Sequence, residues 1–151
     1  MLVALNDMEV KTSDIQNAYL TATCLEKIWT TLGSSFSPDL VGKKALFIRA
    51  LYDLKSAGAS FRNHLKYYMI NIGYSSCLAD PDLWFKKETL PSDGAKYYAY
   101  FLLYVNYCLV IHHDADTALY ELDHFFKMKS GSIRDPNMYL EAKLRKVVVE
   151  N

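Results

Sequence analysis

The sequence has few cysteines and no net charge, and each absence argues against a class of protein. Its three cysteines are widely spaced and form no C-x-x-C pair, which argues against a disulfide framework or a structural zinc site. Lysine and arginine together number 17, and so do aspartate and glutamate. The chain therefore lacks the overall basic field that marks many nucleic-acid-binding proteins, and any such surface must be local.

Long apolar runs and targeting signals are also missing. The longest apolar run, residues 99–105, is far short of the ~20 residues that a membrane-spanning helix requires. Residues 1–25 show no secretory signal pattern, so we expect an intracellular protein, cytoplasmic or nuclear. A length of 151 residues with 51% hydrophobic content predicts a single domain with a substantial core.

Hydrophobic periodicity predicts strands that come in pairs between helices. The predicted strands are residues 8–14, 28–32, 44–51, 83–87, 96–105, 108–111 and 138–149. The predicted helices are residues 15–22, residues 60–72 and a helix capped by Asp116, in which Leu119, Leu122 and Phe126 share a face. The strands at 83–87, 96–105 and 108–111 should be antiparallel neighbours. Without regular β-α alternation, this order favours an α+β fold, an antiparallel sheet with helices packed on one face.

The helix at 60–72 has the clearest pattern. Phe61, Leu65, Tyr68 and Ile72 recur at helical spacing, and Gly73 follows directly. Glycine is the residue that most often ends a helix, because it adopts positive φ without strain.

Six short segments carry a pattern along most of the chain. They are residues 14–20 (DIQNAYL), 51–57 (LYDLKSA), 79–85 (ADPDLWF), 104–107 (YVNY), 126–129 (FKMK) and 139–142 (YLEA). In this order they resemble the palm region of a copia-type retrotransposon reverse transcriptase, an RNA-directed DNA polymerase. The resemblance implies a palm with a ferredoxin-like core over residues 1–151. It also implies a truncated copy, without the upstream fingers, the thumb or the ribonuclease H region.

The resemblance further implies a nucleotidyltransferase that uses two Mg²⁺ ions, a template-primer of RNA or DNA, and deoxynucleotides. Asp14 matches the first catalytic acid of the family, whereas Asn106 and Tyr107 occupy the positions of the acidic pair in Y-V-D-D. Taken alone, Asp14 fits a strand-end or helix-capping acid. Taken alone, Asn106-Tyr107 fits a turn, because Asn tolerates positive φ.

Charge decides what such a site can do. Two divalent ions about 4 Å apart repel by roughly 16 kcal/mol at an effective dielectric of 20, and carboxylates must offset most of that. Asn brings no charge, and Tyr stays protonated at neutral pH. With Asp14 as the only acid, we expect this chain to bind Mg²⁺ unproductively and not to polymerise.

Further site residues follow from the resemblance alone. Tyr19, Tyr104 and Lys55 match nucleotide-binding positions, with Tyr19 beneath the sugar of the incoming nucleotide. Asp53 and Glu141 replace family glycines, and a charged side chain at either position would hinder the backbone or the substrate if that glycine has positive φ or allows close approach.

A local basic cluster lies late in the chain: Lys127, Lys129, Lys143, Arg145 and Lys146. It is either a solvated face or a contact to the primer-template backbone, in which case binding would weaken with salt. Two alternatives to the degenerate polymerase stay open. One is a non-catalytic nucleic-acid-binding or scaffolding module that keeps the fold, and the other is an unrelated α+β binding domain.

Two other signals are weaker. His112 and His113 follow the predicted strand at 108–111, and adjacent residues of an extended chain point to opposite faces. This favours an exposed hairpin end over a metal site. Cys108 has no base near it in the sequence, which favours a buried thiol.

Overall fold

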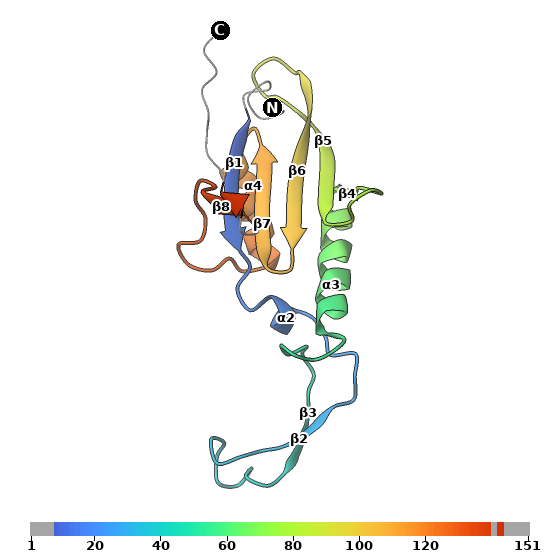
Figure 1. The fold of residues 1–151 in the computed structure, drawn as a ribbon, viewed down its shortest axis with the longest axis vertical. Coiled ribbons are helices and arrows are strands. Elements are labelled where there is room, and N and C mark those ends of the chain that lie inside the picture. Colours follow the sequence, from blue (N-terminus) through green and yellow to red (C-terminus); the bar gives the residue numbers. More distant parts are fainter. Residues whose placement is uncertain (1–7, 140–141, 144–151) are drawn as a thin grey trace. The chain divides into compact units, whose positions relative to one another are not determined.

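The computed structural model describes residues 8–139 and 142–143 of the chain. The chain divides into two compact units. The first comprises Met1–Gln16 and Met69–Asn151, and the second comprises Asn17–Tyr68. Each unit has its own strands and helices (Figure 1).

The first unit is built on a five-stranded antiparallel sheet in the order β1-β7-β6-β5-β4 (Figure 1). The strands are β1 (Glu9–Asp14), β4 (Ser75–Ser76), β5 (Leu83–Thr89), β6 (Lys96–Tyr104) and β7 (Tyr107–His112). The prediction of an antiparallel sheet in a mixed α and β fold is confirmed. The pairing of the three central strands, β5 with β6 and β6 with β7, is confirmed as well.

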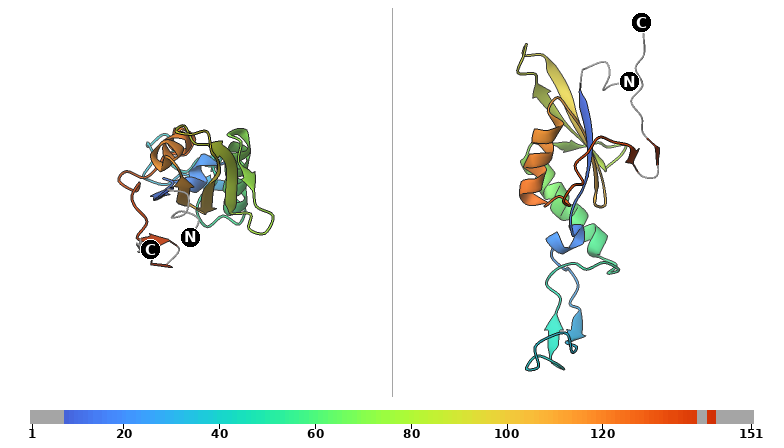
Figure 2. Two further views of the ribbon diagram at one scale, coloured as in Figure 1. Left: turned by 90° about the horizontal axis from the view of Figure 1, so that it is seen from above. Right: turned by 90° about the vertical axis from the view of Figure 1, so that its left-hand side faces the viewer.

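One face of this sheet is covered by helix α4 (Ala115–Phe125), which lies against β1 and β7 (Figure 2). Strand alternation sends every second side chain of β6 and β7 to this face. The core here consists of Ala99, Phe101, Leu103, Cys108 and Val110 from the strands and Ala118, Leu119 and Leu122 from the helix, all buried. The prediction that Leu119, Leu122 and Phe126 share a face is confirmed, because all three side chains are buried.

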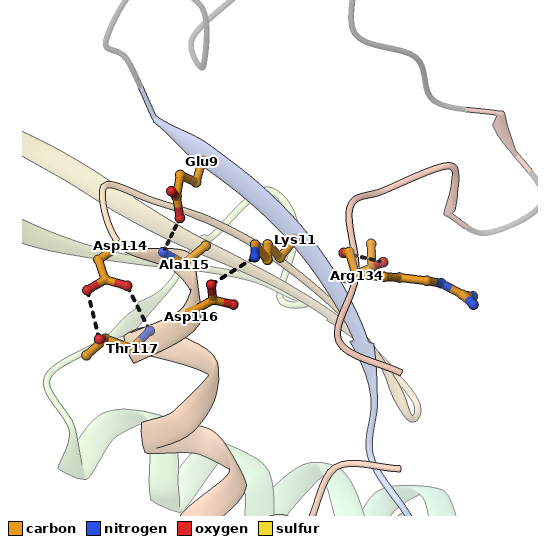
Figure 3. A network of polar contacts seen from close by, with 8 residues as sticks. Glu9, Lys11, Asp114, Ala115, Asp116, Thr117 and Arg134 are labelled. Carbon is orange, nitrogen blue, oxygen red and sulfur yellow. Dashed lines mark hydrogen bonds and ion pairs between the residues drawn. The ribbon is translucent and has the colours of Figure 1, made fainter. Parts of the chain in front are cut away.

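Asp114 caps helix α4, so the prediction that Asp116 is the cap is wrong. The Asp114 carboxylate accepts hydrogen bonds from the Thr117 N–H at 2.9 Å and from the Thr117 hydroxyl at 2.8 Å (Figure 3). These bonds lower the pKa of Asp114. Asp114 and Asp116 are both acids near the start of the helix, and only the residue at which the first turn begins decides which of them is the cap.

Strand β1 holds the first turn of α4 in place from the side. Glu9 accepts a hydrogen bond from the Ala115 N–H at 3.1 Å, and the Lys11 ammonium lies 2.8 Å from the Asp116 carboxylate (Figure 3). One free N–H of the helix terminus is thereby satisfied by a side chain from another element. These contacts fix the start of α4 against the sheet.

The second unit contains helix α2 (Ala18–Thr21), strands β2 (Trp29–Thr31) and β3 (Lys44–Leu46), and most of helix α3 (Ala57–Asn71). Strands β2 and β3 form an antiparallel pair, as predicted, but β3 ends at Leu46 rather than at residue 51. The predicted helix at 15–22 is also shorter. The Ile15 and Gln16 N–H groups donate to the carbonyls of Asn106 and Lys127 instead, because pairing across the sheet satisfies them first.

Helix α3 ends at the predicted glycine. Gly73 has φ of 90°, its N–H donates to the Ile70 carbonyl at 3.0 Å, and the Tyr74 N–H donates to the Met69 carbonyl at 2.9 Å. This pair of bonds is a Schellman motif, which requires a left-handed residue. The chain then enters β4, which the sequence did not predict because two residues carry no periodicity.

The end of the described chain differs from the prediction of one strand at 138–149. Strands β8 (Met138–Tyr139) and β9 (Ala142–Lys143) form a two-stranded antiparallel hairpin, and the remainder of the predicted strand lies outside the described residues. Residues 127–134 were not predicted to join the sheet. They run along the free edge of β1 through bridges at Ile15–Met128 and Thr12–Arg134.

None of the helices in the described ranges has the length and apolar content needed to cross a bilayer.

His112 is half-buried within β7, so the expectation of an exposed hairpin end is wrong for this residue, although His113 is exposed. The His112 Nδ1 accepts a hydrogen bond from the Asp114 N–H at 2.9 Å, and its Nε2 lies 3.3 Å from the Tyr97 hydroxyl. Burial lowers the pKa of His112, although the charges of Glu88, Asp114 and Glu121 oppose the shift. Protonation would remove the acceptor for the Asp114 N–H.

We expect the protein to lose stability as the pH falls from about 7 to about 5. A histidine whose pKa is lower in the folded than in the unfolded state binds more protons when unfolded, so the free energy of unfolding rises with pH through this window. Thermal melts at several pH values would measure it. His112→Asn should flatten the dependence, whereas His124→Asn, at an exposed position of α4, should leave it unchanged. An equal slope in His112→Asn and the wild type would contradict the assignment.

Candidate functional site

The hairpin between β6 and β7 turns over two residues, Val105 and Asn106. Tyr104 and Tyr107 are paired across it as the last and first strand residues. Val105 has φ of 52°, whereas Asn106 is not among the described residues with positive φ. A positive φ at the first loop position alone is the pattern of a type II′ turn.

The turn therefore lies one residue earlier than the predicted break at Asn106-Tyr107. Tyr107 belongs to β7, and Val105 takes the positive φ that was expected of Asn106. A β-branched residue rarely adopts this conformation, which costs of order 1–3 kcal/mol for residues other than glycine. Strain of this kind is concentrated at functional sites, and this strained turn lies beside the one predicted acid.

Asp14 ends β1 directly opposite Tyr107, and Tyr107 is opposite Tyr104. The three residues thus form one row across three strands, with neighbouring Cβ atoms about 4.5–5.5 Å apart. The Ile15 N–H donates to the Asn106 carbonyl at 2.7 Å, which ties the turn to the end of β1. The structure therefore brings together four of the predicted site residues.

On the side of β1 away from β7, the segment 127–134 hydrogen-bonds to Asp14. The Lys129 N–H donates to the Asp14 carbonyl at 2.8 Å, and the Asp14 N–H donates to the Ser132 hydroxyl at 3.1 Å. Ser132 also hydrogen-bonds Ser13 at 2.9 Å, and both serines are buried. Sequence reasoning missed this serine pair, because two isolated serines separated by more than a hundred residues form no recognisable motif.

Cys108 is fully buried beside Asp14, as predicted for a structural thiol. Burial, with a contribution from the nearby Asp14 carboxylate, raises the pKa of the Cys108 thiol. A thiol that stays protonated is a poor nucleophile and a poor metal ligand. The chemistry of this region therefore depends on Asp14 alone.

The residues around Asp14 do not fit a pair of Mg²⁺ ions. Mg²⁺ prefers charged oxygen ligands in octahedral geometry, and the row supplies one carboxylate and two phenols. The Asn106 side chain adds only an uncharged amide oxygen. Within the described residues, no three His, Cys, Asp or Glu side chains gather closely enough to hold a metal ion.

Tyr19 and Lys55, the other predicted nucleotide-binding residues, belong to the second unit. The partly buried Tyr19 ring lies 4.7 Å from the Tyr52 ring and 6.0 Å from the Phe61 ring, as a core aromatic does. Lys55 is exposed. The Ser56 N–H and hydroxyl donate to the Glu26 carboxylate and lower its pKa, and the charge of Lys55 adds to that effect.

Asp53 has φ of 68°. The left-handed conformation favours glycine, and Asp is one of the few other residues that adopt it. Asp53, which stands where the family has glycine, therefore has the left-handed backbone conformation that glycine adopts most easily.

The predicted basic cluster is only partly described. Lys127 is already paired, since its ammonium lies 2.6 Å from the Asp123 carboxylate. Lys129 and Lys143 are exposed. Arg145 and Lys146, together with Glu141, lie outside the described residues.

Comparison of the chain with protein-family models, with curated proteins and with solved structures finds no match.

We expect Val105→Gly to raise the free energy of unfolding by about 1 kcal/mol, because glycine is preferred at the first position of a type II′ turn and relieves the strain. Urea unfolding would measure the change. Val41→Gly is the matched control, at an exposed turn position without positive φ. It should lower stability by roughly 0.5–1 kcal/mol. Equal destabilisation by both substitutions would contradict the strain at Val105.

Proposed function

We propose that this chain is the palm region of a copia-type reverse transcriptase that has lost its metal-binding acids and does not polymerise DNA. The observation that carries the proposal is the row formed by Asp14, Tyr107 and Tyr104 beside the turn at Val105-Asn106. In a Y-V-D-D sequence at 104–107, two carboxylates would stand next to Asp14. Residues from two separate motifs, 14–20 and 104–107, therefore lie next to each other in the sheet.

The strand order supports a ferredoxin-like palm. Strand β7 lies between β1 and β6. The chain between β1 and β6 contains helix α3, followed by β4 and β5, so β1, α3 and β6 resemble a split βαβ unit with two added strands. Strand β7 leads through α4 to the segment 127–134, and β1 lies between the two. Two interlocked split βαβ units are the core of a ferredoxin-like fold, here extended by β5 and β4.

Backbone conformation at two positions gives further support. Val105 and Asp53 both have positive φ, and neither residue is the best choice for its position by local propensity. Asp53 occupies a family glycine, and Val105 occupies the turn of the family's catalytic hairpin. A backbone inherited from an active ancestor explains the positive φ of Asp53, because side chains diverge more readily than the turns that hold them. Val105 is the residue that Y-V-D-D itself has at this turn.

The electrostatics explain the expected inactivity. In the family, a pair of Mg²⁺ ions lowers the pKa of the attacking hydroxyl and stabilises the leaving group. This chain offers those ions the single carboxylate of Asp14, against a mutual repulsion of roughly 16 kcal/mol at 4 Å and an effective dielectric of 20. What its own residues do is limited to holding the sheet edge, through the backbone bonds of Asp14 to Lys129 and Ser132.

We expect no primer extension by this protein with Mg²⁺ or Mn²⁺. A labelled primer-template with all four deoxynucleotides would be resolved on a denaturing gel. Asp14→Asn is the matched control, and its background should equal that of the wild type, because Asp14 alone holds no productive ion pair. Incorporation by the wild type that is lost in Asp14→Asn would refute the proposal.

A second test adds one carboxylate opposite Asp14. We expect Tyr107→Asp to melt at a lower temperature than Tyr107→Asn in EDTA, because like charges directly across a sheet are destabilising by about 0.2–1 kcal/mol. Mn²⁺ should raise the melting temperature of Tyr107→Asp but not that of Tyr107→Asn. If Mn²⁺ fails to distinguish the two variants, the row is not the remnant of a metal site.

A non-catalytic nucleic-acid-binding module that keeps this fold is the second candidate. The observation that favours it is the open face of the sheet, opposite α4, where Tyr98, Tyr104 and Tyr107 are each about half exposed.

A further inference from the structure

The sheet has one face without a covering helix in the first unit. Side chains that are paired across neighbouring strands share a face, so the register defines which residues lie opposite α4. On β5 and β6 these are Leu83, Phe85, Lys87, Thr89, Lys96, Tyr98, Tyr100, Leu102 and Tyr104. On β7 and β1 they are Tyr107, Leu109, Ile111, Val10, Thr12 and Asp14, of which Leu109 and Thr12 are buried. We call this set the open face.

Aromatic rings dominate the open face. The ring centroids of Phe85 and Tyr98 lie 6.1 Å apart in an edge-to-face arrangement. The ring centroids of Tyr98 and Tyr100 lie 6.4 Å apart. Tyr98 is 47% exposed, Tyr104 is 49% exposed and Tyr107 is 48% exposed. Rings this exposed on a rigid antiparallel sheet offer flat surfaces for stacking.

The charges on the open face have one sign beside these rings. Lys87 is paired with Tyr98 across the strands, and Lys96 lies two residues before Tyr98 on the same strand. Among the open-face residues, the only acid is Asp14, at the opposite end of the strands. The aromatic surface is therefore bordered by cations where an anionic ligand would need them.

We propose that the open face binds single-stranded nucleic acid, with bases stacked on Tyr98 and Tyr100 and phosphates near Lys87 and Lys96. This inference rests on the second function proposed above, nucleic-acid binding. Bases stack on aromatic side chains whatever their sequence, and lysines attract the backbone. A duplex keeps its bases stacked on one another, so it cannot use these rings. The occupant is therefore a single strand.

The experiment is fluorescence anisotropy with a labelled deoxythymidine oligonucleotide of about 12 nucleotides, within the usual site size for such surfaces. Tyr98→Leu should weaken binding about tenfold, whereas Tyr98→Phe keeps the ring and should stay within about twofold of the wild type. Tyr120→Leu is the matched control, because Tyr120 is 75% exposed on α4 and should have no effect. Thermal melts show whether each variant is folded. Tyr100→Leu, at the second stacking position, is a second variant and should also weaken binding.

A salt series tests the lysines separately. Each phosphate contact contributes a slope of about −0.7 to log K against log salt for a single strand. Lys87→Gln and Lys96→Gln should each reduce the slope by about that amount, and Lys66→Gln, exposed on α3, should not. Unchanged slopes in both open-face variants would overturn the role of these lysines.

Three outcomes would overturn the inference in different ways. If the wild type binds no oligonucleotide, nucleic-acid binding fails as a function together with this surface. If the wild type binds and folded Tyr98→Leu binds equally well, the function stands and its surface lies elsewhere. If sedimentation shows self-association that Tyr98→Leu abolishes, without oligonucleotide binding, the open face is an interface between two copies of the chain.

Discussion

The register between β1 and β7 is the constraint on which the arrangement of this protein depends. It puts Asp14 opposite Tyr107 and Ser13 opposite Cys108. Side chains alternate between faces, so a shift by one residue would turn Asp14 towards α4 and expose Ser13. The buried bond between Ser13 and Ser132 opposes such a shift. So do the contacts of Glu9 and Lys11 with the first turn of α4, because both side chains must stay on the helix side.

The same register explains how the fold tolerates the residues at 106 and 107. A carboxylate directly across from Asp14 would repel it unless a cation lay between them. A phenol and an amide remove that requirement, so the sheet edge is stable without a metal. The strain at Val105 is then local to the turn, and the hydrogen bond from Ile15 to Asn106 holds the turn in place despite it.

Prediction from sequence succeeded where periodicity was long and failed where long-range contacts decided. Strands β5, β6 and β7 and the buried face of α4 followed from alternation and helical spacing over many residues. The two-residue β4 has no period to detect. The segment 127–134 pairs with β1 across more than a hundred residues, and no local signal announces that. His112 was expected to be exposed, and its contact with Tyr97 comes from another strand, β6.

The sequence by itself determined the composition of the candidate site: one acid at the end of a strand, and an amide and a phenol at a hairpin. Residue types decide charge, and charge decides whether divalent ions can be held. Only the tertiary structure decided that these residues form one row, that Val105 rather than Asn106 takes the positive φ, and that Phe85, Tyr98, Tyr100, Tyr104 and Tyr107 share an open face. Cross-strand register depends on pairing between segments that are distant in the sequence, so it cannot be predicted from the local sequence of either segment.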